Sequence, residues 1–141
     1  MQEKMTLDEI REYFKRDKFA TNCLGAQVDS FEEDPYRAQV SMTIDNDKHL
    51  NGHGFLMGGV TMSLCDFALA VCSNTGQIPS ASVDHHMEIM NRCKGERLIA
   101  KAECAKNGHT LSFYEINVYD ELGTHIGRMT ATTMRTGKVN M

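Results

Sequence analysis

The segment from residue 54 to residue 76 constrains the fold most strongly, because Asp66 is its only ionisable residue. Its continuous helical part, Val60 to Ser73, is apolar nearly all round and is shorter than the roughly 20 residues that a bilayer-spanning helix needs. Other parts of the chain must therefore cover such a helix on most sides. We predict a long helix buried within the domain and no membrane partner.

The chain on both sides of this helix alternates between apolar and polar residues, which is typical of strands with one wet face. Before the helix we predict strands over 26–33 and from residue 37 to about residue 44, joined by a turn at 33–36. After it we predict strands over 82–91, 98–106, 111–119 and 126–135, with a two-residue hairpin at Asn107-Gly108 and a turn at 120–123. The pattern predicts an α+β fold in which a curled antiparallel sheet wraps one central helix.

The N-terminal segment predicts an amphipathic helix over residues 1–20, because Leu7, Ile10 and Phe14 recur at helical spacing after Thr6. Its charges lie where a secretion signal needs an apolar core, so we expect a cytoplasmic protein. The 141 residues fit a single domain, 1–141. The net charge of -4, with scattered Lys and Arg, argues against a nucleic-acid partner. The five cysteines show no C-x-x-C spacing, so we expect reduced thiols that are mostly buried.

Gly58 and Gly59 open the apolar helix, and they allow a ligand to approach the backbone closely. The free N–H groups at the start of a helix can stabilise an oxygen that acquires negative charge. We expect Asp66 to be buried and its pKa to be raised by desolvation, which suits a base or a nucleophile. At 1.5 Å per residue, Asp66 lies roughly 12 Å from Gly58 along the helix. A catalytic role therefore predicts a dimer in which Gly58 of one chain faces Asp66 of the other.

The segment from Asn51 to Gly59, followed by Asp66-Phe67-Ala68, resembles the PaaI-like hotdog-fold acyl-CoA thioesterases. That family has a loop reading roughly N-x-H-G-x-x-H-G-G and an acidic residue in a D-x-A setting on the helix. The likeness continues in Ser82-Val83-Asp84 and covers about residues 25–136. It implies a hotdog fold and hydrolysis of an aryl- or medium-chain acyl-CoA to a free acid and CoA. It also implies no cofactor and no metal, with sites at the interface of a homodimer that pairs into a homotetramer.

The resemblance also implies a role for individual residues. Gly58 would donate its N–H to the thioester carbonyl, and Asn51 would orient the substrate or a water. Asp66 would act as nucleophile or general base, and Ser82 would help to hold the water or Asp66. The residues expected to contact the substrate are Met57, Gly59, Phe67 and Val83. Whether an anhydride forms or Asp66 activates a water stays open.

The sequence departs from the family at Met57, where a His normally precedes the glycine pair. Methionine can fill the space but cannot make the hydrogen bond with which that His fixes the loop. This departure keeps a second function open, which is a non-catalytic acyl-CoA or acyl-carrier binding protein. A hydratase or dehydratase of the same fold is disfavoured, because its catalytic His setting is missing.

Each candidate also has a structural interpretation. Asp66 could cap another element or pair with an Arg, the glycines could permit close packing, Asn51 could stabilise its own loop, and Ser82 could be structural. A metal site built from His49, His53, His85 and His86 is disfavoured, because the first two lie in a glycine-rich loop and the last two point to opposite faces of a strand. The cluster Arg92, Lys94, Glu96 and Arg97 could meet the phosphates of CoA, but a solvated turn is favoured.

Overall fold

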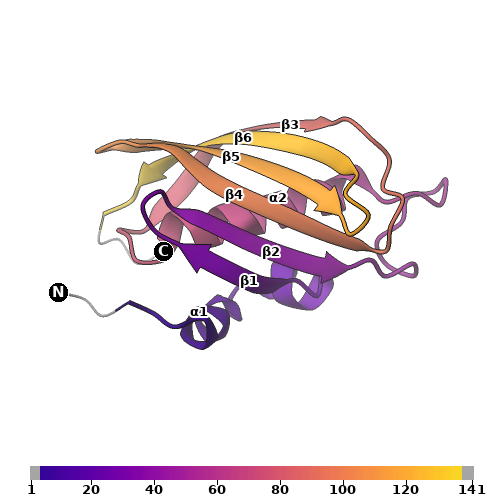
Figure 1. Cartoon of the computed structure of the whole chain (residues 1–141), viewed down its shortest axis with the longest axis horizontal. Coiled ribbons are helices and arrows are strands. Elements are labelled where there is room, and N and C mark those ends of the chain that lie inside the picture. The colour runs from indigo at the N-terminus through magenta and orange to yellow at the C-terminus, as the bar shows by residue number, and fades with distance from the viewer. Residues whose placement is uncertain (1–3, 138–141) are drawn as a thin grey trace.

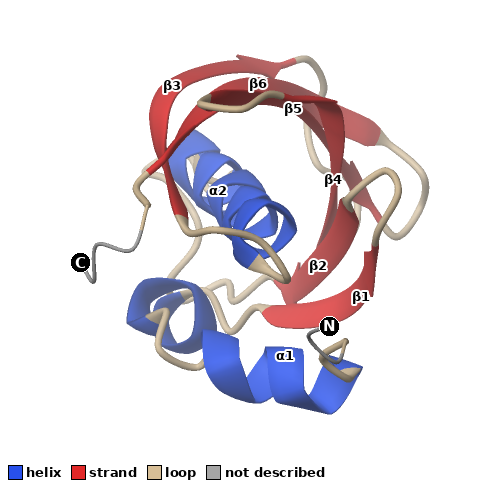
Figure 2. Ribbon diagram, turned by 90° about the vertical axis from the view of Figure 1, so that its left-hand side faces the viewer, coloured by secondary structure: helices blue, strands red, loops and turns tan. Residues whose placement is uncertain are grey.

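The computed structural model describes residues 4–137 and shows one antiparallel sheet curled around a central helix (Figures 1 and 2). The sheet order is β1-β2-β4-β5-β6-β3. The elements follow the order α1 (Leu7–Phe14), a π-helical turn η1 (Phe19–Cys23), β1 (Gln27–Glu32), β2 (Arg37–Thr43), α2 (Gly58–Asn74), β3 (Ser80–Ile89), β4 (Arg97–Asn107), β5 (Leu111–Asp120) and β6 (His125–Arg135). The predicted α+β hotdog fold is confirmed, and each predicted strand is found within three residues of its expected bounds.

The core lies between α2 and the concave face of the sheet. Leu64, Ala68 and Val71 of α2 are buried, and so are the inward-facing residues of the strands that α2 contacts, such as Val40 and Ala100. Burial of this apolar surface is the main force that curls the sheet onto the helix. In residues 4–137 we find no helix with both the length and the apolar character that crossing a membrane requires.

The N-terminal helix is shorter than the sequence suggested. Thr6 caps it as expected, with its hydroxyl oxygen accepting from the Glu9 N–H at 3.2 Å. The helix ends at Phe14, and the π-helical turn η1 was not predicted. The expectation of one helix over 1–20 is therefore wrong beyond Phe14, and residues 1–3 lie outside the described part of the chain. Its apolar positions Ile10 and Phe14 are buried, which explains why periodicity located the helix but not its end.

The Asn107-Gly108 hairpin differs from the prediction in its loop. The strands end at Asn107 and resume at Leu111, so the connection is residues 108–110. Gly108 does not adopt a positive φ. Glycine is required here because a Cβ at this position would collide with the carbonyl oxygen of Leu111. The turn at 120–123 is confirmed, and Gly123 has a φ of +87°.

Asp120 fixes one end of the sheet. Its buried carboxylate accepts backbone N–H groups from Lys94, Gly95, Leu122 and Thr124 at 2.9–3.1 Å. Burial alone would raise its pKa, but these hydrogen bonds hold the pKa below its usual value. The β3–β4 connection is therefore tied firmly to the β5–β6 turn.

Candidate functional site

The loop before α2 is held by Asn51. Its side-chain oxygen accepts the N–H groups of His53 at 2.9 Å and Phe55 at 3.1 Å, and its own N–H donates to the Phe55 carbonyl at 2.7 Å. Asn51 therefore stabilises its own loop, which is the structural role considered for it from the sequence. The amide NH₂ of this residue makes no hydrogen bond within residues 4–137, and it remains free to donate to a ligand.

His49 anchors the same loop in a way that the sequence did not indicate. One ring nitrogen, Nδ1, accepts the Asp45 N–H at 2.8 Å, and Nε2 lies 2.9 Å from the Cys23 carbonyl. Both nitrogens are therefore used inside the protein, and Nε2 must carry the proton. The described residues contain no group of three or more His, Cys, Asp or Glu side chains placed to hold a metal ion.

Gly58 and Gly59 are the first two residues of α2, as expected for an oxyanion-binding helix start. Their N–H groups have no acceptor within the described chain, and Met57 in front of them makes no side-chain cap. A Cβ on Gly58 would lie 2.8 Å from Cδ1 of Ile89 in β3. Close packing and a free N–H are therefore combined at this glycine. Met57 is 54% exposed and lies at the same end of the helix.

Asp66 is not buried in the single chain, so this part of the prediction is wrong. Its side chain is 56% exposed, because Gly59, Met62 and Asp66 form a stripe along α2 that the sheet does not cover. The stripe is the reason that a helix which looks apolar all round can still present a carboxylate at the surface. The expected direction of the pKa is confirmed: partial burial raises the pKa of Asp66, His85 lowers it and Asp17 raises it, with a net increase.

A β-bulge between Ser82 and Asp84 determines which residues of β3 face Asp66. Ser82 pairs with Thr133 and His85 pairs with Ala131, and both partners are buried on the helix side of the sheet. Cross-strand partners share a face, so Ser82 and His85 both face α2 despite their odd spacing. His85 Nε2 lies 3.4 Å from Oδ1 of Asp66. The sequence placed His85 and His86 on opposite faces but did not connect His85 with Asp66.

The expected substrate contacts separate into two groups. Met57, Gly59 and Val83 are exposed, on α2 or beside it in β3. Phe67 is only 2% exposed, and its ring packs edge-on against Phe14 with centroids 6.1 Å apart. Phe67 is a core residue, and the expectation that it contacts the substrate is not supported by its position.

The basic cluster that follows β3 is Arg92, Lys94, Glu96 and Arg97, and most of these residues have interaction partners within the protein. The Arg92 guanidinium lies 3.7 Å from the centre of the Phe55 ring, and Arg97 donates to Ser41 and Thr43. The backbone N–H groups of Glu96 and Arg97 donate to the Glu121 carboxylate. These contacts favour an ordered surface turn, and Arg92 connects this turn to the loop before α2.

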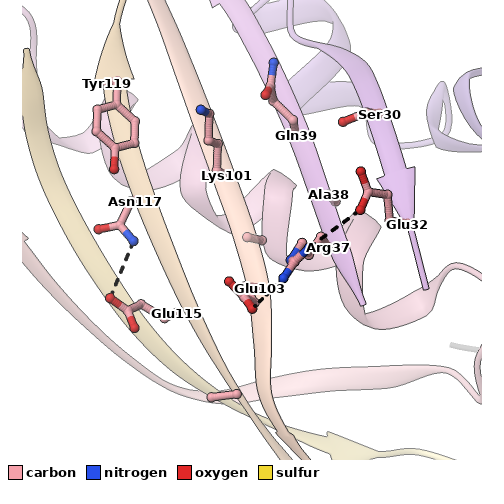
Figure 3. Close-up of a pocket in the computed structure, with 12 residues that line it drawn as sticks. Ser30, Glu32, Arg37, Ala38, Gln39, Lys101, Glu103, Glu115, Asn117 and Tyr119 are labelled. Carbon is pink, nitrogen blue, oxygen red and sulfur yellow. Dashed lines mark hydrogen bonds and ion pairs between the residues drawn. The ribbon is translucent and has the colours of Figure 1, made fainter. Parts of the chain in front are cut away.

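A cavity of about 660 Å³ lies away from Asp66 and Gly58, on the outer face of the sheet (Figure 3). Its charged side chains already have partners there. Arg37 lies 3.7 Å from Glu32 and 3.4 Å from Glu103, and Asn117 donates to Glu115 at 3.4 Å. We call these residues the outer-face network. It has the character of a solvated surface, because most of the side chains that line it are charged or polar.

The chain is similar to a known family and to several known proteins. Residues 53–126 match the model of the thioesterase superfamily. A curated relative from Deinococcus radiodurans, a putative esterase, is 36% identical over 60% of this chain, and the match spans 57% of that relative's length. A variant of the phenylacetic acid degradation protein PaaI from Thermus thermophilus is 28% identical, with 82% of this chain and 96% of that chain covered and a TM-score of 0.73. A Streptococcus mutans protein solved with acetyl-CoA bound is 24% identical, with 80% and 90% covered and a TM-score of 0.72.

Proposed function

Because the chain belongs to the thioesterase superfamily, we propose that it hydrolyses an acyl-CoA to a free acid and CoA. The observation that carries the proposal is Asp66, a carboxylate with a raised pKa on the open stripe of α2. The same helix begins with two N–H groups that have no acceptor in the described chain. A base and an oxyanion-binding site are the two components that acyl transfer to water requires.

The chemistry assigns one task to each component. The Gly58 N–H donates to the thioester carbonyl oxygen and stabilises the charge that develops there. Asp66 takes a proton from water as the water oxygen attacks the carbonyl carbon, the C–S bond breaks, and the CoA thiolate takes up a proton. Alternatively, Asp66 attacks the carbon itself, the C–S bond breaks to release the CoA thiolate, which takes up a proton, and water then hydrolyses the resulting anhydride to the free acid and the Asp66 carboxylate. The free NH₂ of Asn51 and the hydroxyl of Ser82 are suited to orient substrate and water.

The proposed active unit is a homodimer. Gly58 and Asp66 lie eight residues apart on one helix, roughly 12 Å, so a single chain cannot present both to one thioester. The edge strand β3 supports a second copy, because it ends the sheet beside the open stripe and exposes Val83 and Ile89. Pairing two copies at this edge would bring Gly58 of one subunit toward Asp66 of its partner.

The proposed substrates are aryl- or medium-chain acyl-CoAs. The apolar side chains around the open stripe, Met57, Met62 and Val83, suit such groups, and methionine adapts to varied shapes. The similarity to a phenylacetic acid degradation protein and to a protein that binds acetyl-CoA supports a CoA thioester.

The test is thiol release from a panel of phenylacetyl-, benzoyl-, short-chain and long-chain acyl-CoAs, with wild type and Asp66→Ala. Turnover that falls by about 10²–10⁴-fold in the variant is expected for loss of a general base or nucleophile. Tight binding of acyl-CoA by wild type without thiol release would instead support a binding protein. That second function has a specific basis in Met57, which replaces the family's loop-fixing His.

A further inference from the structure

His85 lies close to Asp66 in a position that the proposed mechanism does not yet use. Its Nε2 atom is buried and has no hydrogen-bond partner within the described residues, although the ring as a whole is 21% exposed. Among the residues that the structure describes, the only acidic group within ion-pair distance of this atom is the Asp66 carboxylate, 3.4 Å away. An unpaired buried ring nitrogen is costly, and a small rotation of either side chain would satisfy it.

We propose that His85 is a positioning residue for Asp66, which donates its Nε2–H to Oδ1 and leaves Oδ2 to act on the thioester or on water. The inference rests on the proposed function, because it assigns a task to the two oxygens of the same carboxylate. Contacts of this kind are often long in the absence of substrate and shorten when the site is occupied. A charge-assisted N–H···O bond has a length of about 2.7–2.9 Å, so closure from 3.4 Å requires the two atoms to approach by roughly 0.5–0.7 Å.

The bulge in β3 makes this arrangement possible. Ser82 already faces α2, so a regular strand would turn Asp84 and His86 toward the helix and His85 away from it. The extra residue between Ser82 and Asp84 reverses this order and places His85 beside Asp66. Ser82 and His85 therefore face the same side, although they are three positions apart in sequence.

The charges around the pair determine the expected pH dependence. Asp17, from the segment between α1 and η1, acts on Asp66 with a like charge, and His85, from β3, acts with the opposite charge. Cys65 is the neighbouring titratable group on α2, and burial together with Asp66 raises the pKa of its thiol to about 12, so it stays neutral. Removal of His85 should therefore let Asp66 keep its proton to higher pH.

The experiment compares His85→Leu, His85→Gln and His86→Gln with wild type. Glutamine keeps an N–H donor near the position of Nε2 without titrating, whereas leucine removes the donor. His86 is the matched control because it is the adjacent residue on the exposed face of β3. We expect kcat for thiol release to fall about tenfold or more in His85→Leu, with the acid limb of the pH profile moved to higher pH. His85→Gln should recover most of the rate, and His86→Gln should match wild type.

Two further readouts separate a positioning role from simple packing. In an Asp66→Asn background, His85→Leu should change the residual rate by less than about twofold, because His85 acts through Asp66. The carboxyl ¹³C resonance of Asp66 should titrate at higher pH in His85→Leu than in wild type. The proposal is overturned if that titration does not move, if leucine and glutamine lower kcat to the same extent, or if His86→Gln moves the acid limb as much as His85→Leu does.

The titration also distinguishes failure of the proposed function from failure of the positioning role of His85. If wild type releases no thiol, the proposed function fails, and the NMR titration alone decides whether His85 controls Asp66. If wild type turns over and depends on Asp66, but neither the acid limb nor the titration responds to His85→Leu, only the positioning role fails.

Discussion

Two surfaces of the domain differ in what surrounds their charged residues. In the outer-face network, Arg37 lies between Glu32 and Glu103, and the charges neutralise one another in solvent. On the open stripe of α2, Asp66 is the carboxylate, and the exposed apolar side chains of Met62 on the stripe and of Val83 and Ile89 on the edge strand β3 lie on the same side of the domain.

The difference favours the open stripe as the binding surface. Exposed ion pairs contribute little to stability and are expected wherever strands meet water. A carboxylate with a raised pKa beside exposed apolar side chains has no such explanation, because it costs stability and leaves apolar area in water. The open stripe is therefore the surface where a partner subunit and a substrate are expected to meet.

The largest expected effect comes from a charge placed on that surface. Ile89→Lys should convert the proposed homodimer to a monomer, because burying an unpaired ammonium at an interface costs several kcal/mol. Thiol release should fall by more than about 100-fold, since each site would lose the partner's half. Mass measurement by light scattering, together with the thiol assay, tests both points.

Two variants control that experiment. Ile89→Ala also removes the contact with Gly58 but adds no charge, so it should remain dimeric. His86→Lys adds the same charge to the outer face of β3 and should change neither mass nor rate. A dimer that survives Ile89→Lys with full activity would contradict the proposed interface.

A smaller effect is expected at Met57, where a hydrogen-bonding side chain is missing at the start of α2. Met57→His should raise kcat/KM by up to about tenfold, which is the value of one ordinary hydrogen bond. Met57→Leu supplies a similar volume without the bond and should stay within about twofold of wild type. An unchanged rate in Met57→His would mean that Asn51 and His49 already hold the loop firmly enough.

Much of the fold could be predicted because its signals are local. Thr6, the alternating strands and the apolar run after Gly59 each define an element from neighbouring residues alone. The end of the first helix and the turn η1 depend on how Phe14 and Ala20 pack into the core, and a local pattern does not contain that information. Gly108 shows the same limit, because its need for glycine comes from the Leu111 carbonyl rather than from its own φ.

Less of the site could be predicted, because parts of it depend on how elements that are far apart in the sequence pack together. Asn51, Gly58 and Asp66 could be selected from the sequence because they lie on one continuous loop and helix. The exposure of Asp66 could not, because it depends on which face of α2 the curled sheet leaves open. The approach of His85 depends on a bulge in a distant strand, where a single extra residue reverses the faces of all that follow.

The smallest expected effect is on stability, and it compares the two surfaces directly. Because the pKa of Asp66 is raised in the folded state, the folded chain binds this proton more tightly than the unfolded chain does. The stabilising contribution of the protonated form is fully present below the unfolded pKa of about 3.9, and it is lost as pH rises through the folded pKa. Asp66→Asn should therefore raise the free energy of unfolding at pH 7, and the gain should shrink toward pH 4.

The gain should stay below about 1 kcal/mol, because the side chain is more than half exposed and solvent screens its charge. Glu115→Gln in the outer-face network is the matched control, and it should change stability by less than about 0.5 kcal/mol at either pH. Urea unfolding at pH 4 and pH 7 measures both variants. A loss of stability in Asp66→Asn at pH 7 would show that the carboxylate is stabilised by its surroundings, and the contrast between the two surfaces would then have to be abandoned.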